Sequence, residues 1–224
     1  MSNTYNVPVE LIDRCRWVTP KNSGWLQYQL NEKELDFIWK AIEKKKGSIK
    51  PTLAGNLSYS WELEDTDDWL FKNTLYPLTH IYGQEFGNKG RNIPVIDNHP
   101  YRLWTWWVNY QKKHEFNPIH DHSGVYSFVI WLKIPIEHDD QNRGFVTNTP
   151  CRSAFCFHYT DILGEIQTHY YTLGKEWEGT LLFFPSDLKH EVYPFYDCDE
   201  DRISVSGNLF IDEHTLYGDD SDAK

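Results

Sequence analysis

Residues 183–208, FFPSDLKHEVYPFYDCDEDRISVSGN, are predicted to hold the end of one strand, a turn, and then two strands separated by a polar connection. His190 follows the Pro-Ser-Asp turn, and Arg202 opens the last of these strands, with Ser204 two positions further on. Side chains two residues apart in a strand point to the same face of a sheet, so Arg202 and Ser204 face the same way. A histidine aimed inward near an inward arginine and serine can hold a metal ion beside an anionic ligand.

A second group of histidines lies upstream, in His120-Asp121-His122. In an extended chain both imidazoles can meet one metal ion while Asp121 points the other way. Imidazole is a ligand for iron, zinc, copper and nickel, and His190 can complete a set of three ligands that leaves the opposite positions open. The simpler alternative is that these polar residues are merely exposed at a junction between loop and strand.

Arg202 makes the prediction more specific. Its guanidinium is a planar set of donors that matches a carboxylate in bidentate fashion, and Ser204 adds a hydroxyl on the same face. A charged group on a core-facing strand is costly unless it meets an anion. The alternative is an ion pair at the surface with one of the acidic residues of 197–201.

Length and composition limit the class of protein. The 224 residues favour a single domain, and the 10 Trp, 14 Tyr and 12 Phe supply ample core. A formal net charge of −11 disfavours nucleic acid as a partner. The four cysteines form no CxxC pair, and neither a leader nor an apolar run of about 18 residues is visible, so we expect a cytoplasmic chain with reduced thiols and no membrane span.

The N-terminal part is predicted to be irregular at first and then helical. Asn31 is a candidate N-cap, followed by early glutamates and an apolar stripe at helical spacing that ends in lysines and Gly47. A second helix is predicted from about Thr66 to Tyr82, with Pro77 as a point of interruption.

Beyond residue 100 the pattern changes to short aromatic and β-branched runs separated by turn residues, which is typical of strands. The chain is expected to be mainly β, a jelly roll with supporting N-terminal helices. We expect one domain over 1–224, with helical or irregular support in 1–100, the jelly-roll core in 101–211 and an acidic tail in 212–224. The predicted strands are Tyr101–Tyr110, Tyr126–Ile134, Ser153–Tyr159, Ile166–Leu173, Thr180–Phe184, His190–Tyr196 and Arg202–Ile211.

Two segments carry a family resemblance: WWVNYQKKHEFNPIHDHSGVYSFVIWLKIP (106–135) and GTLLFFPSDLKHEVYPFYDCDEDRISVSGN (179–208). With these the chain resembles the 2-oxoglutarate and iron(II)-dependent oxygenases, and within them a small branch also found in phage genomes. The resemblance implies a double-stranded β-helix, with His190 as the distal iron ligand. It also implies that Arg202 and Ser204 bind the C5 carboxylate of 2-oxoglutarate, and Asn109 is a weaker candidate for contact with this co-substrate.

The chain departs from the family pattern at the proximal ligands. The family usually has His-x-Asp or His-x-Glu, whereas this chain has His120-x-His122. If the backbone were bulged here, Asp121 would be the ligand and one histidine would lie outside the coordination sphere. We favour His120, His122 and His190 as the metal ligands and expect no catalytic residue beyond them.

The resemblance implies an Fe(II)- and 2-oxoglutarate-dependent dioxygenase that uses O2 and releases succinate and CO2. Its substrate is expected to be a protein side chain, such as proline, or a small molecule; the sequence specifies neither this substrate nor the oligomeric state. One alternative is a cupin-type three-histidine metalloenzyme that does not use 2-oxoglutarate. Another is a non-catalytic jelly-roll binding or structural protein, with Trp104, Trp106 and Trp107 as stacking surface.

Overall fold

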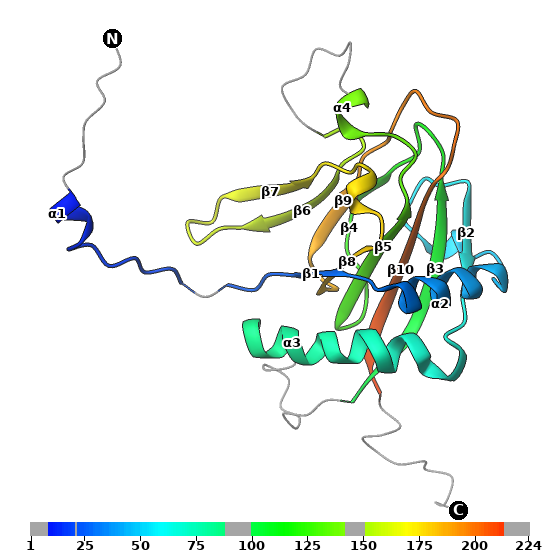
Figure 1. The fold of residues 1–224 in the computed structure, drawn as a ribbon, viewed down its shortest axis with the longest axis horizontal. Coiled ribbons are helices and arrows are strands. Elements are labelled where there is room, and N and C mark those ends of the chain that lie inside the picture. Colours follow the sequence, from blue (N-terminus) through cyan, green and yellow to red (C-terminus); the bar gives the residue numbers. More distant parts are fainter. Residues whose placement is uncertain (1–8, 21, 88–99, 142–150, 213–224) are drawn as a thin grey trace, which may run out of the picture.

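The structure, a computed structural model, describes residues 9–20, 22–87, 100–141 and 151–212. Two antiparallel sheets form the predicted jelly roll, and the longer helices lie along one side of the larger sheet (Figure 1). No helix within these residues combines the length and apolar character needed to cross a membrane.

The larger sheet has six strands in the order β1-β8-β5-β10-β3-β2. Its two outer strands come from the region expected to be helical or irregular, and the four inner strands come from the predicted core. Strands β5 and β8 contribute apolar side chains to both faces of the sheet and read as nearly continuous apolar runs, whereas β3 and β10 also carry polar residues. The strands are β1 (Leu26–Gln29), β2 (Tyr59–Glu62), β3 (Tyr101–Gln111), β5 (Tyr126–Lys133), β8 (Thr180–Pro185) and β10 (Arg202–Ile211).

The smaller sheet has the order β4-β9-β6-β7. Its edge strand β4 (Asn117–His120) was not predicted, because Pro118 weakens the strand pattern of so short a segment. The predicted strand His190–Tyr196 is shorter in the structure, since β9 ends before Pro194. The remaining strands are β6 (Phe155–Thr160), β7 (Ile166–Tyr171) and β9 (Lys189–Val192).

The first predicted helix is present as α2 (Glu32–Glu43). Asn31 accepts hydrogen bonds from the backbone N–H groups of Lys33 and Glu34, and the Glu34 carboxylate accepts one from the N–H of Asn31. This reciprocal capping box explains why the helix begins at this point. Glu34 also accepts a hydrogen bond from Thr74, which ties α2 to the next helical segment.

The second helical region differs from the prediction at both ends. A 3-10 turn (Thr66–Asp68) and a π-helical turn (Phe71–Leu75) lead into α3, which spans Tyr76–Phe86. Pro77 lies in the first turn of α3, directly after the π-helical turn. The helical geometry thus changes from π to α beside the proline, at the predicted point of interruption.

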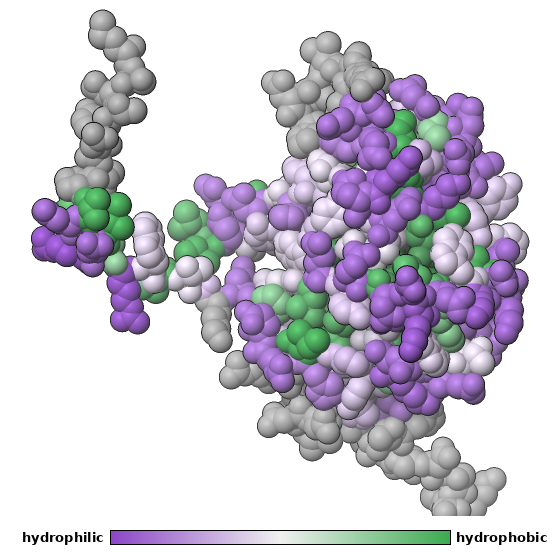
Figure 2. Space-filling model, viewed as in Figure 1, coloured by the Kyte–Doolittle hydropathy of each residue, from purple (hydrophilic) through white to green (hydrophobic). Residues whose placement is uncertain are grey.

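The shorter helical elements lie outside these layers. Figure 2 shows apolar residues of α1 (Val9–Ile12) on the surface of a segment that extends from the main body. The others are α4 (His138–Gln141) and the 3-10 turns Lys50–Thr52 and Lys175–Trp177.

The larger sheet has one apolar cluster on each face. The first joins α2 and α3 to the outward-facing residues of the sheet, including Val108, Phe128 and Val205. The second lies on the opposite face and includes Trp131 and Phe157. Side chains of β3 and β10 alternate between the faces, so every second residue of these strands points away from the helices. The candidate site lies on that inner face.

Candidate functional site

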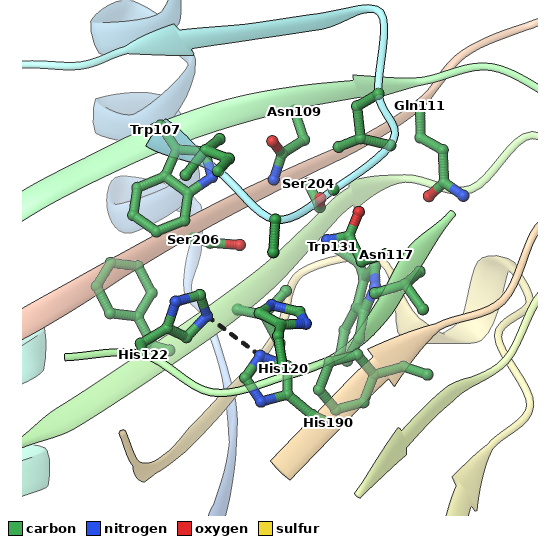
Figure 3. A pocket seen from close by; sticks show the side chains of 18 of the residues that line it. Trp107, Asn109, Gln111, Asn117, His120, His122, Trp131, His190, Ser204 and Ser206 are labelled. Carbon is green, nitrogen blue, oxygen red and sulfur yellow. Dashed lines mark hydrogen bonds between the residues drawn. The ribbon is translucent and has the colours of Figure 1, made fainter. Parts of the chain in front are cut away.

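Three histidines converge at the edge of the smaller sheet. His120 ends β4 and pairs in register with His190 of β9, and His122 follows two residues later. The backbone N–H of His122 donates to the carbonyl of Ser186 at 2.9 Å, which holds this connection against the end of β8. The ring centroids lie 4.3 to 4.9 Å apart, and one ligand atom from each residue lies within 4.8 Å of the others (Figure 3).

Backbone carbonyls orient two of the three rings. Nδ1 of His120 lies 2.7 Å from the carbonyl oxygen of Pro118, and Nδ1 of His190 lies 2.8 Å from that of Leu188. A carbonyl only accepts, so each Nδ1 carries the hydrogen and each Nε2 presents a lone pair.

The spacing of the ring nitrogens suits a metal ion. Nε2 of His190 lies 3.2 Å from Nε2 of His122. With metal–nitrogen bonds of about 2.1 Å, two ligands at a right angle lie about 3 Å apart. The donor set therefore fits an imidazole-binding transition metal, with three ligands on one side.

Burial favours the neutral form of these rings. Loss of solvation lowers the pKa of His122 to about 4 and lowers the pKa of His120. The pKa of His190 is lowered well below its usual value by burial and by the two neighbouring rings. Neutral imidazole is the form that binds metals, so the cluster is ready to bind an ion at neutral pH.

Asp121 lies outside the cluster. Its carboxylate forms an ion pair with Lys189 at the surface, and this contact lowers the pKa of the carboxyl group. The structure thus brings together His120, His122 and His190, the set favoured from the sequence, and directs Asp121 elsewhere.

A polar wall faces the histidines from the larger sheet. Adjacent strands β3 and β10 place Gln111 opposite Arg202, Asn109 opposite Ser204 and Trp107 opposite Ser206. Figure 3 shows Trp107, Asn109 and Gln111 projecting from one strand and Ser204 and Ser206 from its neighbour. One pocket is lined by all six residues predicted from the sequence: Asn109, His120, His122, His190, Arg202 and Ser204.

Arg202 forms the inner end of this pocket and is 2% exposed. Its Nε and Nη2 donate to Oε1 of Gln111 at 3.1 and 2.8 Å, and Nη2 also donates to the carbonyl of Tyr193 at 3.0 Å. Nη1 donates to the carbonyl and hydroxyl oxygens of Ser153 at 2.8 and 3.2 Å. All these acceptors are uncharged.

The predicted alternative, a surface ion pair for Arg202, does not form. Asp199 pairs with Lys113 and Glu200 pairs with Lys133 instead. In the described part of the chain no carboxylate forms an ion pair with Arg202, and burial lowers the pKa of its guanidinium to about 9. A buried cation without an anion is costly, which makes this end of the pocket a binding place for a carboxylate.

Asn109 is positioned by a neighbouring strand. Its Oδ1 accepts from the hydroxyl of Ser60 on β2 at 2.7 Å, so the Nδ2 group is left to face the pocket. Asn208 on β10 is held by a hydrogen bond between strands, in which the Ser127 hydroxyl of β5 donates to its Oδ1 at 2.8 Å.

Several lining residues were not predicted. Gln111 is a side-chain partner of Arg202, and Leu53, Ala54 and Gly55 cover the pocket from a segment far from the motifs. Ser153, which accepts from Arg202 behind the pocket, was not predicted either. An amide partner and an opposite loop have no local sequence pattern. Only the cross-strand register, which places Gln111 opposite Arg202, could have indicated Gln111 as its partner.

A wider hollow of about 340 Å³ opens beside the histidines. His120 and His122 line it together with residues of the 49–54 segment and of β3 and β10. Trp104, which is 57% exposed, lies in this hollow with the Arg102 guanidinium 4.3 Å from its ring centroid. The histidine cluster is thus reached from a partly aromatic surface.

Fold and site together define a jelly-roll protein with a three-histidine centre and an arginine-ended pocket. Residues 105–208, slightly less than half of the chain, match the model of a family described as "Putative 2OG-Fe(II) oxygenase". The matched range contains all six predicted site residues and confirms the resemblance to 2-oxoglutarate and iron(II) oxygenases. The family description names both expected cofactors, 2-oxoglutarate and iron(II). The relation to a phage branch stays a prediction.

Solved structures agree on the fold. A 2OG-Fe(II) oxygenase family oxidoreductase from Burkholderia pseudomallei has a TM-score of 0.52 at 16% identity, over 84% of each chain. A prolyl hydroxylase from Trichoplax adhaerens, in complex with a peptide fragment of hypoxia inducible factor, has a TM-score of 0.52 at 11% identity, over 88% of this chain and 87% of that one. No curated protein matches the sequence.

Proposed function

We propose that this protein is an Fe(II)- and 2-oxoglutarate-dependent oxygenase that hydroxylates a protein side chain, such as proline, or a small molecule. The main support is one pocket lined by three converging imidazoles and by a buried arginine that forms no ion pair with any carboxylate of the described residues. The family match over the same residues supports both cofactors. The prolyl hydroxylase among the similar folds was solved with a peptide, which supports the protein side chain as one substrate class.

Each part of the pocket has a separate task in this proposal. His120, His122 and His190 hold iron(II) on one side and leave its other positions free. Arg202 and Ser204 bind the C5 carboxylate of 2-oxoglutarate, and Asn109 orients the co-substrate through its free amide group. The bound iron, with 2-oxoglutarate and oxygen, supplies the oxidising chemistry that couples decarboxylation to succinate and CO2 with hydroxylation of the substrate.

The surrounding residues exclude water and position the substrate. Trp131 and Phe155 line the pocket between the sheets and keep its wall apolar near the histidines. The hollow beside His120 and His122 is the proposed route of the substrate, with Trp104 as a contact surface. The cytoplasmic location stays a prediction.

The test is reconstitution with iron(II) under anaerobic conditions, followed by addition of 2-oxoglutarate and oxygen and measurement of succinate. We expect succinate release from the wild type, loss of metal and turnover in His190→Ala, and loss of turnover with iron retained in Arg202→Ala. Thermal unfolding of Arg202→Ala shows whether it remains folded, and Ser204→Ala serves as a milder change expected to raise the KM for 2-oxoglutarate.

The three-histidine centre also favours a second candidate, a cupin-type metalloenzyme, since that class often uses a His-x-His pair. Iron-dependent oxidation that persists unchanged in Arg202→Ala would favour this candidate. A protein that binds no metal and releases no succinate would refute both metalloenzymes and favour a binding module.

A further inference from the structure

Gln111 occupies the face of Arg202 that a carboxylate would use. Oε1 of Gln111 accepts from Nε at 3.1 Å and from Nη2 at 2.8 Å, the pair of donors along one edge of the guanidinium. A carboxylate binds an arginine through such a parallel pair of donors. Arg202 and Gln111 lie directly opposite each other on β10 and β3, so this contact is built into the register of the sheet.

The other acceptors of Arg202 are fixed in place. Two are the backbone carbonyls of Ser153 and Tyr193. Ser153 has a left-handed backbone (φ 57°), and its N–H donates to the carbonyl of Pro194 at 2.9 Å, so its carbonyl is held toward Nη1. Of the acceptors on Nε and Nη2, the Gln111 side chain is therefore the one that bond rotation alone can remove, since the other is the backbone carbonyl of Tyr193.

The orientation of the Gln111 amide is also determined. Its Nε2 donates to the carbonyl of Glu115 at 2.5 Å, in the turn that follows β3. Since that carbonyl can only accept, the amide oxygen must face Arg202. Gln111 is 5% exposed and lines the same pocket as Ser204 and the histidines.

We propose that Gln111 is a displaceable substitute for the co-substrate carboxylate: the entering carboxylate takes the place of Oε1 on Nε and Nη2 of Arg202, and Gln111 rotates away. The identity of that carboxylate, 2-oxoglutarate, rests on the proposed function. The exchange replaces a neutral acceptor by an anionic one on a cation, and hydrogen bonds between charged partners are about twice as strong as neutral ones. Gln111 thus sets the affinity for the co-substrate without touching the metal.

The exchange makes opposite predictions for two substitutions. Gln111→Ala removes the competing oxygen, so the Kd for 2-oxoglutarate should fall about fivefold, the effect of about one net hydrogen bond. Gln111→Glu tethers a competing carboxylate beside Arg202, and a tethered group competes at millimolar or higher effective concentration, so the Kd should rise at least about 100-fold. Gln27→Glu, which adds the same charge at an exposed position of β1, is the matched control and should leave the Kd unchanged.

The experiment is titration of the zinc-loaded protein with 2-oxoglutarate and, separately, with glutarate, which has the same terminal carboxylate without the 2-oxo group. Calorimetry gives the Kd, NMR follows the Nε–H signal of Arg202 in the wild type, and thermal unfolding verifies that each variant is folded. The proposal expects this signal to shift with both ligands and the two variants to change the Kd in opposite directions.

A rise in Kd for Gln111→Ala would overturn the proposal, because Gln111 would then be a support that Arg202 needs in the complex. Binding of either ligand without a shift of the Arg202 signal, or no binding of either ligand, would also overturn it. A shift of this signal in a protein that releases no succinate would refute the proposed function but leave the exchange at Arg202 supported.

Discussion

Replacement of Gly207 by alanine should destabilise the sheet that carries the arginine pocket. Gly207 lies in the middle of β10, opposite Trp106 on β3 and Phe128 on β5. A Cβ at this position would lie 2.7 Å from two ring atoms of Phe128 and 2.8 Å from Cβ of Trp106. Both neighbours are buried within the apolar cluster under α2 and α3, so neither can move freely into solvent.

The expected loss follows from this overpacking. Extra carbon atoms in a packed core cost about 1–3 kcal/mol. For a protein of this size each kcal/mol lowers Tm by about 2–4 °C, so Gly207→Ala should melt about 2–12 °C below the wild type. The assay is thermal unfolding followed by circular dichroism, with urea unfolding for the free energy.

The control is Gly47→Ala, at a position where a Cβ would meet nothing within 4 Å. That change should leave the free energy of unfolding unaltered or slightly higher, since alanine restricts the unfolded chain. Adding Phe128→Leu to Gly207→Ala should recover about 1 kcal/mol relative to the sum of the single changes, as expected of residues in contact. Equal stability of the two alanine variants, or strict additivity in the double variant, would refute the reasoning.

Three further predictions concern the helix cap, the thiols and the metal. Asn31→Ala removes the acceptor of two N–H groups at the start of α2, and the free energy of unfolding in urea should fall by about 1 kcal/mol; no change would contradict the role of the cap. Burial raises the pKa of the Cys156 thiol to about 12, so its labelling by a disulfide reagent should stay slow from pH 7 to 9 and slower than that of the exposed Cys15; rapid labelling of both in the folded protein would be the contrary result. A metal ion at a concentration of 100 times its Kd should raise the free energy of unfolding of the wild type by about 2.7 kcal/mol and raise its Tm. The rise in Tm should be absent in His190→Ala; an equal rise in the wild type and the variant would mean that the ion binds elsewhere.

Much of the fold could be predicted because local patterns agree with the final structure. The N-cap at Asn31 and the apolar stripe after it define α2, and the aromatic and β-branched runs define most inner strands. The errors lie where tertiary contacts decide. Pro118 lies inside a strand because β4 is an edge, and the second helical region begins with a 3-10 turn and a π-helical turn in place of a regular α-helix.

The candidate site was predictable in its motifs but not in its supports. The spacing of His120 and His122 and that of Arg202 and Ser204 indicate shared faces, and the structure places all four in one pocket. Their roles as ligands of iron and 2-oxoglutarate stay predictions. Gln111 could not be predicted in the same way, because its importance depends on the register between β3 and β10, which no local pattern encodes.

The pairing of His120 with His190 has a mechanical consequence. β4 has four residues, lies at the edge of its sheet and pairs only with β9 among the described strands. An ion held by His120, His122 and His190 would cross-link this edge to its neighbour and close a long stretch of chain, as a disulfide does. Removal of the ion would leave β4 held by few hydrogen bonds. Loss of metal should therefore loosen the edge of the smaller sheet in addition to removing the chemistry of the site.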